Sequence, residues 1–95
     1  MITVMVELHV KEAYRENYPE RLQRAFPDTL SFPGCLAIEA FRNVEERGRI
    51  TVMEQWQSLE DYKRYMEWRR SQGTLAEIGD MMASPMQVSI LEKLA

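Results

Sequence analysis

The chain opens with a strict alternation of apolar and other residues. Every second position in the first segment is apolar: Ile2, Val4, Val6, Leu8 and Val10. This period of two predicts a β-strand with one strongly apolar face. Met5 is the main apolar residue of the opposite face.

Three further segments predict strands. They are Cys35–Val44, Arg49–Trp56 and Met86–Leu94, and the last carries Val88 and Ile90 on one face. The first two are separated by the polar run Glu45–Gly48, which predicts a hairpin turn.

The first predicted helix follows the opening strand. Asn17 is a candidate N-cap, with Glu20 at the third helical position. Apolar or small residues then recur at three- and four-residue spacing: Leu22, Ala25, Phe26, Thr29 and Leu30. Pro27 is expected to kink or break this helix, and Pro33–Gly34 to end it.

A second helix is predicted from Leu59 to about Ser71. Ser58 and Asp61 have the spacing of an N-cap and its partner, because the serine hydroxyl can accept from a free amide of the first turn. Thr74–Glu77 has the pattern of another capping box and predicts a short helix, which Ser84–Pro85 ends.

The resulting order is β-α-β-β-α-β. It predicts an α+β, ferredoxin-like fold, with a four-stranded antiparallel sheet and both main helices on one face. We expect residues 1–95 to form a single domain, since the sequence has no linker, repeat or low-complexity segment. Apolar residues on both strand faces favour a back-to-back homodimer that covers the second face.

Charge and composition exclude several classes of function. The net charge is −3 and the basic residues are scattered, so no basic face is available for nucleic acid. One cysteine precludes an internal disulfide. The start lacks the basic region of a signal peptide, and no apolar run is long enough to cross a membrane. These features predict a soluble cytoplasmic protein without nucleic-acid or membrane partners.

The layout and an ordered set of local signatures resemble the antibiotic biosynthesis monooxygenase family of dimeric α/β barrels. The similarity covers nearly the full chain. Beside the opening strand and the segment from Leu22 to Cys35, it rests on Glu54-x-Trp56-x-Ser58, Tyr62-x-x-Tyr65-x-x-Trp68-Arg69 and Ser84-Pro85. The resemblance implies a homodimer with a pocket in each subunit between sheet and helices. Some members oxygenate quinol- or anthrone-like aromatics without metal or flavin, some degrade haem, and many have no established activity.

The resemblance makes Trp56 and Tyr62 the first catalytic candidates, because oxygenase-like members place a Trp and a Tyr at corresponding positions of the pocket wall. Oxygenation without a cofactor needs a deprotonated, electron-rich aromatic in a dry site with hydrogen-bond donors. A phenol hydroxyl and an indole N–H are such donors. The alternative is that both rings simply fill the core at a strand–helix junction.

Tyr65, Trp68 and Arg69 are candidate substrate-binding residues on the second helix. Tyr65 and Arg69 share a helical stripe with Tyr62, while Trp68 lies about 100° further round. Arg69 could direct its guanidinium at a substrate oxygen. The alternative is an ordinary surface ion pair with an acidic residue nearby, namely Glu60, Asp61 or Glu77.

His9 is the third catalytic candidate. It is the only histidine, and a side chain that titrates near neutrality suits the removal of a phenolic proton. It could equally be a structural or interface residue of its strand. One His, one Cys and scattered carboxylates give no metal-ligand spacing, and the absence of any His after residue 9 disfavours haem degradation.

The sequence therefore favours a cofactor-independent monooxygenase acting on a quinol- or anthrone-like aromatic. The alternative is a non-catalytic small-molecule-binding or stress-response protein on the same dimeric fold.

Overall fold

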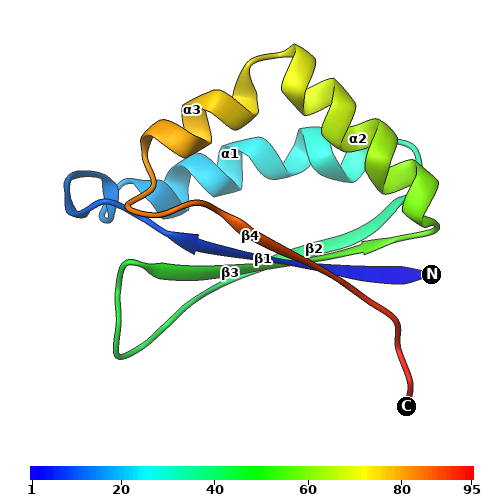
Figure 1. Cartoon of the computed structure of the whole chain (residues 1–95), viewed down its shortest axis with the longest axis horizontal. Helices are drawn as coiled ribbons and strands as arrows, with labels where there is room; N and C mark the ends of the chain where they lie inside the picture. Colours follow the sequence, from blue (N-terminus) through cyan, green and yellow to red (C-terminus); the bar gives the residue numbers. More distant parts are fainter.

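A four-stranded antiparallel sheet carries three helices on one of its faces in the computed structural model, which describes residues 1–95 (Figure 1). The strands are β1 (Ile2–His9), β2 (Cys35–Arg42), β3 (Arg49–Trp56) and β4 (Gln87–Leu91), in the order β2-β3-β1-β4. The main helices are α1 (Tyr18–Ser31), α2 (Leu59–Ser71) and α3 (Thr74–Asp80), and a short 3-10 helix, η1, spans Glu12–Tyr14. This confirms the predicted ferredoxin-like α+β fold.

The alternation in β1 determines which residues enter the core. Val4, Val6 and Leu8 are buried under the helices, and their neighbours point to the opposite face. β3 pairs with β1 in register, so its helix-facing positions continue the same layer: Ile50, Val52, Glu54 and Trp56. The core therefore lies between the two central strands and the helical layer.

The capping signal before α2 is confirmed, and the one before α3 is not. Ser58 Oγ accepts a hydrogen bond from the amide of Asp61 at 3.2 Å, as a serine N-cap does. α3 instead begins after Gly73, which adopts a left-handed conformation, and Thr74 lies inside the helix without a capping bond. Asn17 precedes α1 but its side chain makes no capping bond either.

α1 also continues past Pro27 to Ser31, where the sequence led us to expect a kink or break. A proline within a helix removes the hydrogen bond to the carbonyl four residues earlier, here Gln23. Both Gln23 and Pro27 are exposed, so water can satisfy that carbonyl. β2 and β4 are shorter than predicted, and the remaining residues of both segments lie outside the sheet.

The sheet face away from the helices is uncovered in the single chain (Figure 1). Met5 and Met53 are directly paired at its centre, each half-buried. Around them the face is mixed, because Glu7 and Arg49 lie at one end within 3.9 Å of each other. No helix in the structure combines the length and the apolar character that a bilayer span requires.

Candidate functional site

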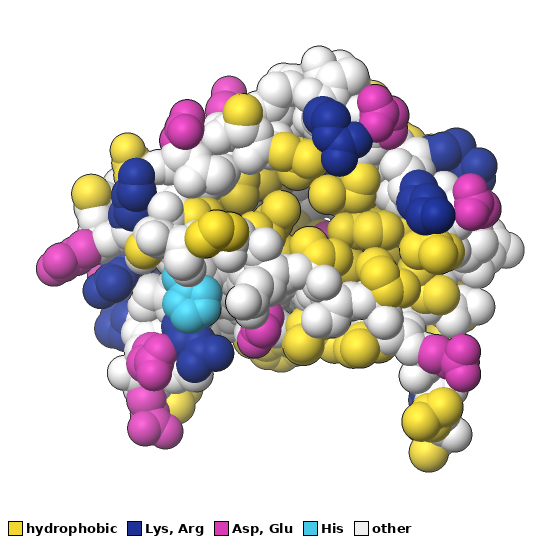
Figure 2. Space-filling model, viewed as in Figure 1, with side chains coloured by type: hydrophobic (Ala, Val, Ile, Leu, Met, Phe, Trp, Pro, Cys, Tyr) yellow, Lys and Arg dark blue, Asp and Glu magenta, His cyan; other side chains and the backbone are white.

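A cavity of about 100 Å³ lies between the sheet and the helices. Its walls are mostly apolar and come from all four strands and all three main helices. Val6, Leu22, Ile38, Val52 and Ile78 are among the lining residues. Figure 2 shows hydrophobic side chains gathered around this hollow, with the charged ones mainly toward the periphery. The lining is therefore that of a site for an apolar or aromatic ligand.

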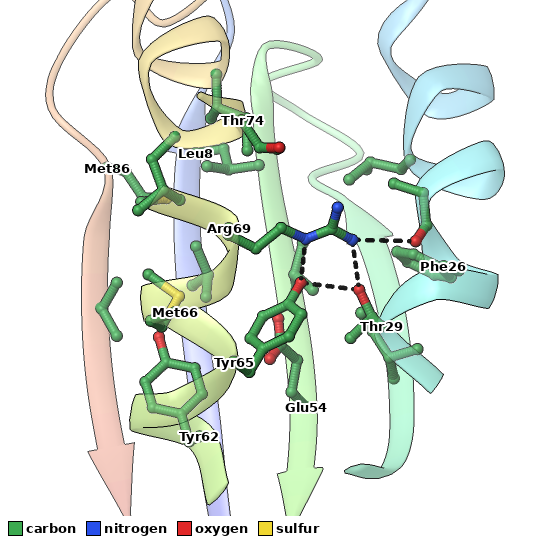
Figure 3. A pocket seen from close by; sticks show the side chains of 18 of the residues that line it. Leu8, Phe26, Thr29, Glu54, Tyr62, Tyr65, Met66, Arg69, Thr74 and Met86 are labelled. Atoms are coloured by element: carbon green, nitrogen blue, oxygen red, sulfur yellow. Dashed lines mark hydrogen bonds between the residues drawn. The ribbon is translucent and has the colours of Figure 1, made fainter. Parts of the chain in front are cut away.

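Only two charged side chains line the cavity, Glu54 and Arg69. Both are buried, with exposed fractions of 6% and 9%. The remaining polar groups of the wall are hydroxyls, including those of Thr29, Tyr62 and Tyr65 (Figure 3).

Arg69 is held by neutral acceptors on both helices. Its Nε donates to the hydroxyl of Tyr65 at 2.9 Å, and its Nη2 donates to Thr29 Oγ1 at 3.0 Å and to the carbonyl of Ala25 at 3.3 Å. Thr29 and Tyr65 are themselves hydrogen-bonded at 2.8 Å. The guanidinium carbon also lies 4.8 Å from the ring centre of Trp68. These bonds connect α1 to α2 across the cavity, and no acidic residue forms an ion pair with Arg69.

Glu54 extends from the helix-facing side of β3. Its Oε1 accepts a hydrogen bond from the indole Nε1 of Trp56 at 2.9 Å. Burial raises the pKa of this carboxyl, while the indole and the positive charge of Arg69 partly oppose the rise. Glu54 is thus a carboxyl group able to hold a proton in a largely apolar site, which suits a general acid or base.

Trp56 lies behind the cavity wall and does not line it. The ring is fully buried, and it packs at 4.9 Å between ring centres from Tyr65 and at 6.2 Å from Phe32. It contacts the site through its hydrogen bond to Glu54 and through the rings of Tyr62 and Tyr65. Trp68 likewise does not line the cavity, and it packs on Phe32 and Arg69.

Tyr62 and Tyr65 both line the cavity from α2, and each is buried. The hydroxyl of Tyr62 makes no hydrogen bond within the protein, whereas that of Tyr65 is engaged by Thr29 and Arg69. Burial raises the pKa of both phenols, and the nearby Glu54 raises that of Tyr62 further. Both hydroxyls therefore stay protonated, and Tyr62 has a donor free for a ligand.

His9 lies on the opposite face of the sheet, paired in register with Arg49. It is away from the hollow in Figure 2, and it does not line the cavity. Of the six residues singled out from the sequence, the structure brings Tyr62, Tyr65 and Arg69 together around the cavity. Trp56 and Trp68 support that group from behind.

Two lining residues were missed as site residues, Glu54 and Thr29. The signal for Glu54 was present, because it is the one acidic side chain among the helix-facing positions of β3. Thr29 was placed on the apolar stripe of the first helix, but nothing in that stripe indicated its bond to Arg69. No group of three or more His, Cys, Asp or Glu side chains is arranged to hold a metal ion.

These features define a ferredoxin-like α+β protein with an apolar cavity between its layers that opens to the surface. The family model "Antibiotic biosynthesis monooxygenase" matches residues 1–75, and the chain belongs to this family. No curated protein matches it significantly.

Solved structures of low sequence identity share the fold along the whole chain. A Nitrosomonas europaea protein that carries the name of the same family superimposes with a TM-score of 0.86 at 19% identity, covering 100% of both chains. A crystal structure named antibiotic biosynthesis monooxygenase gives 0.87 at 15% identity, again over 100% of both chains. Rv0793 from Mycobacterium tuberculosis gives 0.86 at 16% identity, over 99% of this chain and 95% of that one.

Proposed function

We propose that this protein is a cofactor-independent monooxygenase that acts on a quinol- or anthrone-like aromatic bound in the cavity. The observation that carries the proposal is the buried carboxyl of Glu54 in an otherwise apolar cavity that also offers the hydroxyl of Tyr62. Membership of the monooxygenase family supports it. The proposal takes residues 1–95 as one domain, acting in the cytoplasm as a homodimer.

The first step is removal of an acidic proton from the aromatic. Glu54 takes this role in the proposal, in place of His9, because Glu54 lines the cavity and His9 does not. A raised pKa makes the carboxylate a stronger base than an exposed one. Trp56 positions the carboxylate through its indole N–H.

The anion formed in this way then reacts with molecular oxygen. It transfers one electron to O2, and the resulting radical and superoxide combine to a peroxide at a ring carbon that still carries a hydrogen. Glu54 returns its proton to the peroxide. Loss of water from the protonated peroxide leaves a carbonyl, so one oxygen atom enters the product and the other leaves as water. Tyr62 would donate a hydrogen bond to the substrate oxygen as negative charge develops there.

Oxygen uptake tests this proposal directly. Chelator-treated protein is supplied with a panel of hydroquinones and anthrones, and oxygen consumption is followed with an electrode. Glu54→Gln is expected to lower turnover at least ~10²-fold, the typical contribution of a general base. Tyr62→Phe is expected to lower it by ~10²-fold, with the fold intact because its hydroxyl has no partner in the protein.

Two conservative changes outside the cavity serve as controls. Glu60→Gln and Tyr14→Phe make the same chemical changes at exposed positions and should leave turnover unchanged. Unchanged turnover in Tyr62→Phe would remove Tyr62 from the mechanism. No oxygen uptake with any compound would favour the non-catalytic, ligand-binding alternative.

A further inference from the structure

Arg69 carries a buried positive charge that forms no salt bridge. Its exposed fraction is 9%, and its hydrogen-bond acceptors, two hydroxyls and one carbonyl, are all neutral. The rings of Tyr65 and Trp68 lie 5.3 and 4.8 Å from its guanidinium carbon and add a weak attraction. A buried charge is ordinarily paired with an opposite one, so this arrangement is incomplete by itself.

The guanidinium also has donors left over. Arginine presents five N–H groups in a planar fork. The bond from Nε and the two bonds from Nη2 use three of them, and Nη1 has no acceptor within the protein. Figure 3 shows the third nitrogen of Arg69 pointing away from Tyr65 and Thr29, into the space between the helices.

The other charged group of the cavity, Glu54, interacts with the charge of Arg69 but forms no salt bridge with it. Glu54 is not within ion-pairing distance of it and is hydrogen-bonded to Trp56. Arg69 therefore offers a ligand anion its positive charge and the two N–H groups of Nη1.

We infer that the ligand is an aromatic carboxylate, with its carboxylate bound to Nη1 of Arg69 and its ring on the apolar wall. A guanidinium–carboxylate contact is among the strongest hydrogen-bonded pairs in proteins. A phosphate group fits less well, because a dianion needs more donors than one cation surrounded by apolar side chains can provide. This inference rests on the proposed function only in taking the same cavity as the ligand site.

Binding measurements in the absence of turnover test the inference of an aromatic carboxylate ligand. Anaerobic calorimetry at neutral pH compares naphthoate with naphthamide, which has nearly the same shape and no charge, and with naphthol. Naphthoate is expected to bind about ten- to hundredfold more tightly than the amide, the effect of one charge-assisted hydrogen bond. Equal affinities, tighter binding of naphthol, or no binding of naphthoate would overturn the inference.

Variants of two adjacent arginines locate the effect. Arg69→Met should abolish the preference for naphthoate over naphthamide, and Arg69→Lys should keep part of it, since the charge remains but the planar fork is lost. Arg70→Met makes the same change at an exposed position of the same helix and should retain the full preference. If Arg69→Met fails to fold, comparing the affinities of the unmodified protein for naphthoate and naphthamide still tests whether the cavity prefers a carboxylate.

The two proposals fail in different ways. A preference for the acid over the amide in a protein that consumes no oxygen would refute the monooxygenase proposal and support the carboxylate site. Oxygen uptake with neutral quinols, together with equal binding of acid and amide, would support the monooxygenase proposal and refute the carboxylate site.

Discussion

At the residue scale, Glu54 is the position where stability and proposed chemistry oppose each other. An apolar side chain there would continue the row formed by Ile50 and Val52 on the buried face of β3. The carboxyl instead loses hydration, and burial raises its pKa above the ordinary 4.5. Folding therefore shifts this carboxyl toward its neutral form.

This shift predicts a specific pH dependence of stability. Above pH 4.5 the unfolded chain releases the Glu54 proton while the folded protein still holds it. The free energy of unfolding therefore falls as the pH rises through this window, by at most about 1.4 kcal/mol per pH unit. Glu54→Gln lacks this loss and can still accept from the indole of Trp56, so its stability relative to the unmodified protein should increase with pH.

Urea unfolding at successive pH values measures the effect. Glu60→Gln, at an exposed position of α2, should follow the unmodified protein throughout. Parallel curves for Glu54→Gln and the unmodified protein would show that the Glu54 carboxyl is not perturbed by folding.

Local pattern predicted part of the site. Tyr62, Tyr65 and Arg69 fall on one stripe of a helix, so their convergence follows from helical periodicity alone. The burial of Arg69 could not be predicted, because it depends on how closely α1 approaches α2, and its acceptors Ala25 and Thr29 lie about forty residues away. For an isolated arginine, solvent or a surface ion pair is the usual environment.

At the element scale, the turn between α1 and β2 fixes the start of α2. Gly34 has a φ of +94°, which disfavours any residue with a side chain. Its carbonyl accepts a hydrogen bond from the amide of Gln57 at 2.8 Å, and a Cβ at this position would collide with the side chain of Asp61. Asp61 belongs to the cap of α2, so the turn and the helix start form one unit.

Three glycine substitutions separate backbone strain from this collision. Gly73→Ala, at a φ of +77° with no atom within 4 Å, should lose about 1–2 kcal/mol of unfolding free energy through strain alone. Gly34→Ala should lose about 1–3 kcal/mol more, through the contact with Asp61. Gly79→Ala, in an open helical position, should gain about 0.5–1 kcal/mol. Denaturant unfolding ranks the three, and a Gly34→Ala protein as stable as Gly73→Ala would contradict the steric argument.

Element order was predictable from sequence because each element has its own local signal. The alternation in β1 and β3 and the Ser58 cap each indicate one element without knowledge of the others. The continuation of α1 past Pro27 has a different origin, since it depends on whether solvent can reach the carbonyl of Gln23. Exposure of that kind is a property of the packed structure.

At the scale of the whole molecule, the uncovered sheet face is the surface on which a second copy would pack. The two paired methionines, Met5 and Met53, give it an apolar centre, and the charged pair Glu7–Arg49 lies toward its edge. Exposed Phe41 on β2 and Leu91 on β4 add apolar surface to the same face, and apolar surface of this kind marks a site of protein association.

The proposed dimer is testable in solution. Light scattering at micromolar concentration should give the mass of two chains, and the apparent stability should decrease on dilution. Met53→Lys should shift the protein toward a monomer, because it places a charge at the centre of the interface. Leu30→Lys, at an exposed position of α1, should remain dimeric. A monomeric unmodified protein with stability independent of concentration would refute the dimer.

The N–H groups of Arg69 fall into two sets with different partners. Its Nε and Nη2 groups hold α1 to α2, and its Nη1 group faces the cavity. Because cohesion and recognition use different N–H groups of one side chain, mutations in the surrounding apolar wall can alter ligand preference without separating the helices. On this inference, substitutions in the lining change the ligand while the hydrogen bonds that join α1 to α2 stay in place.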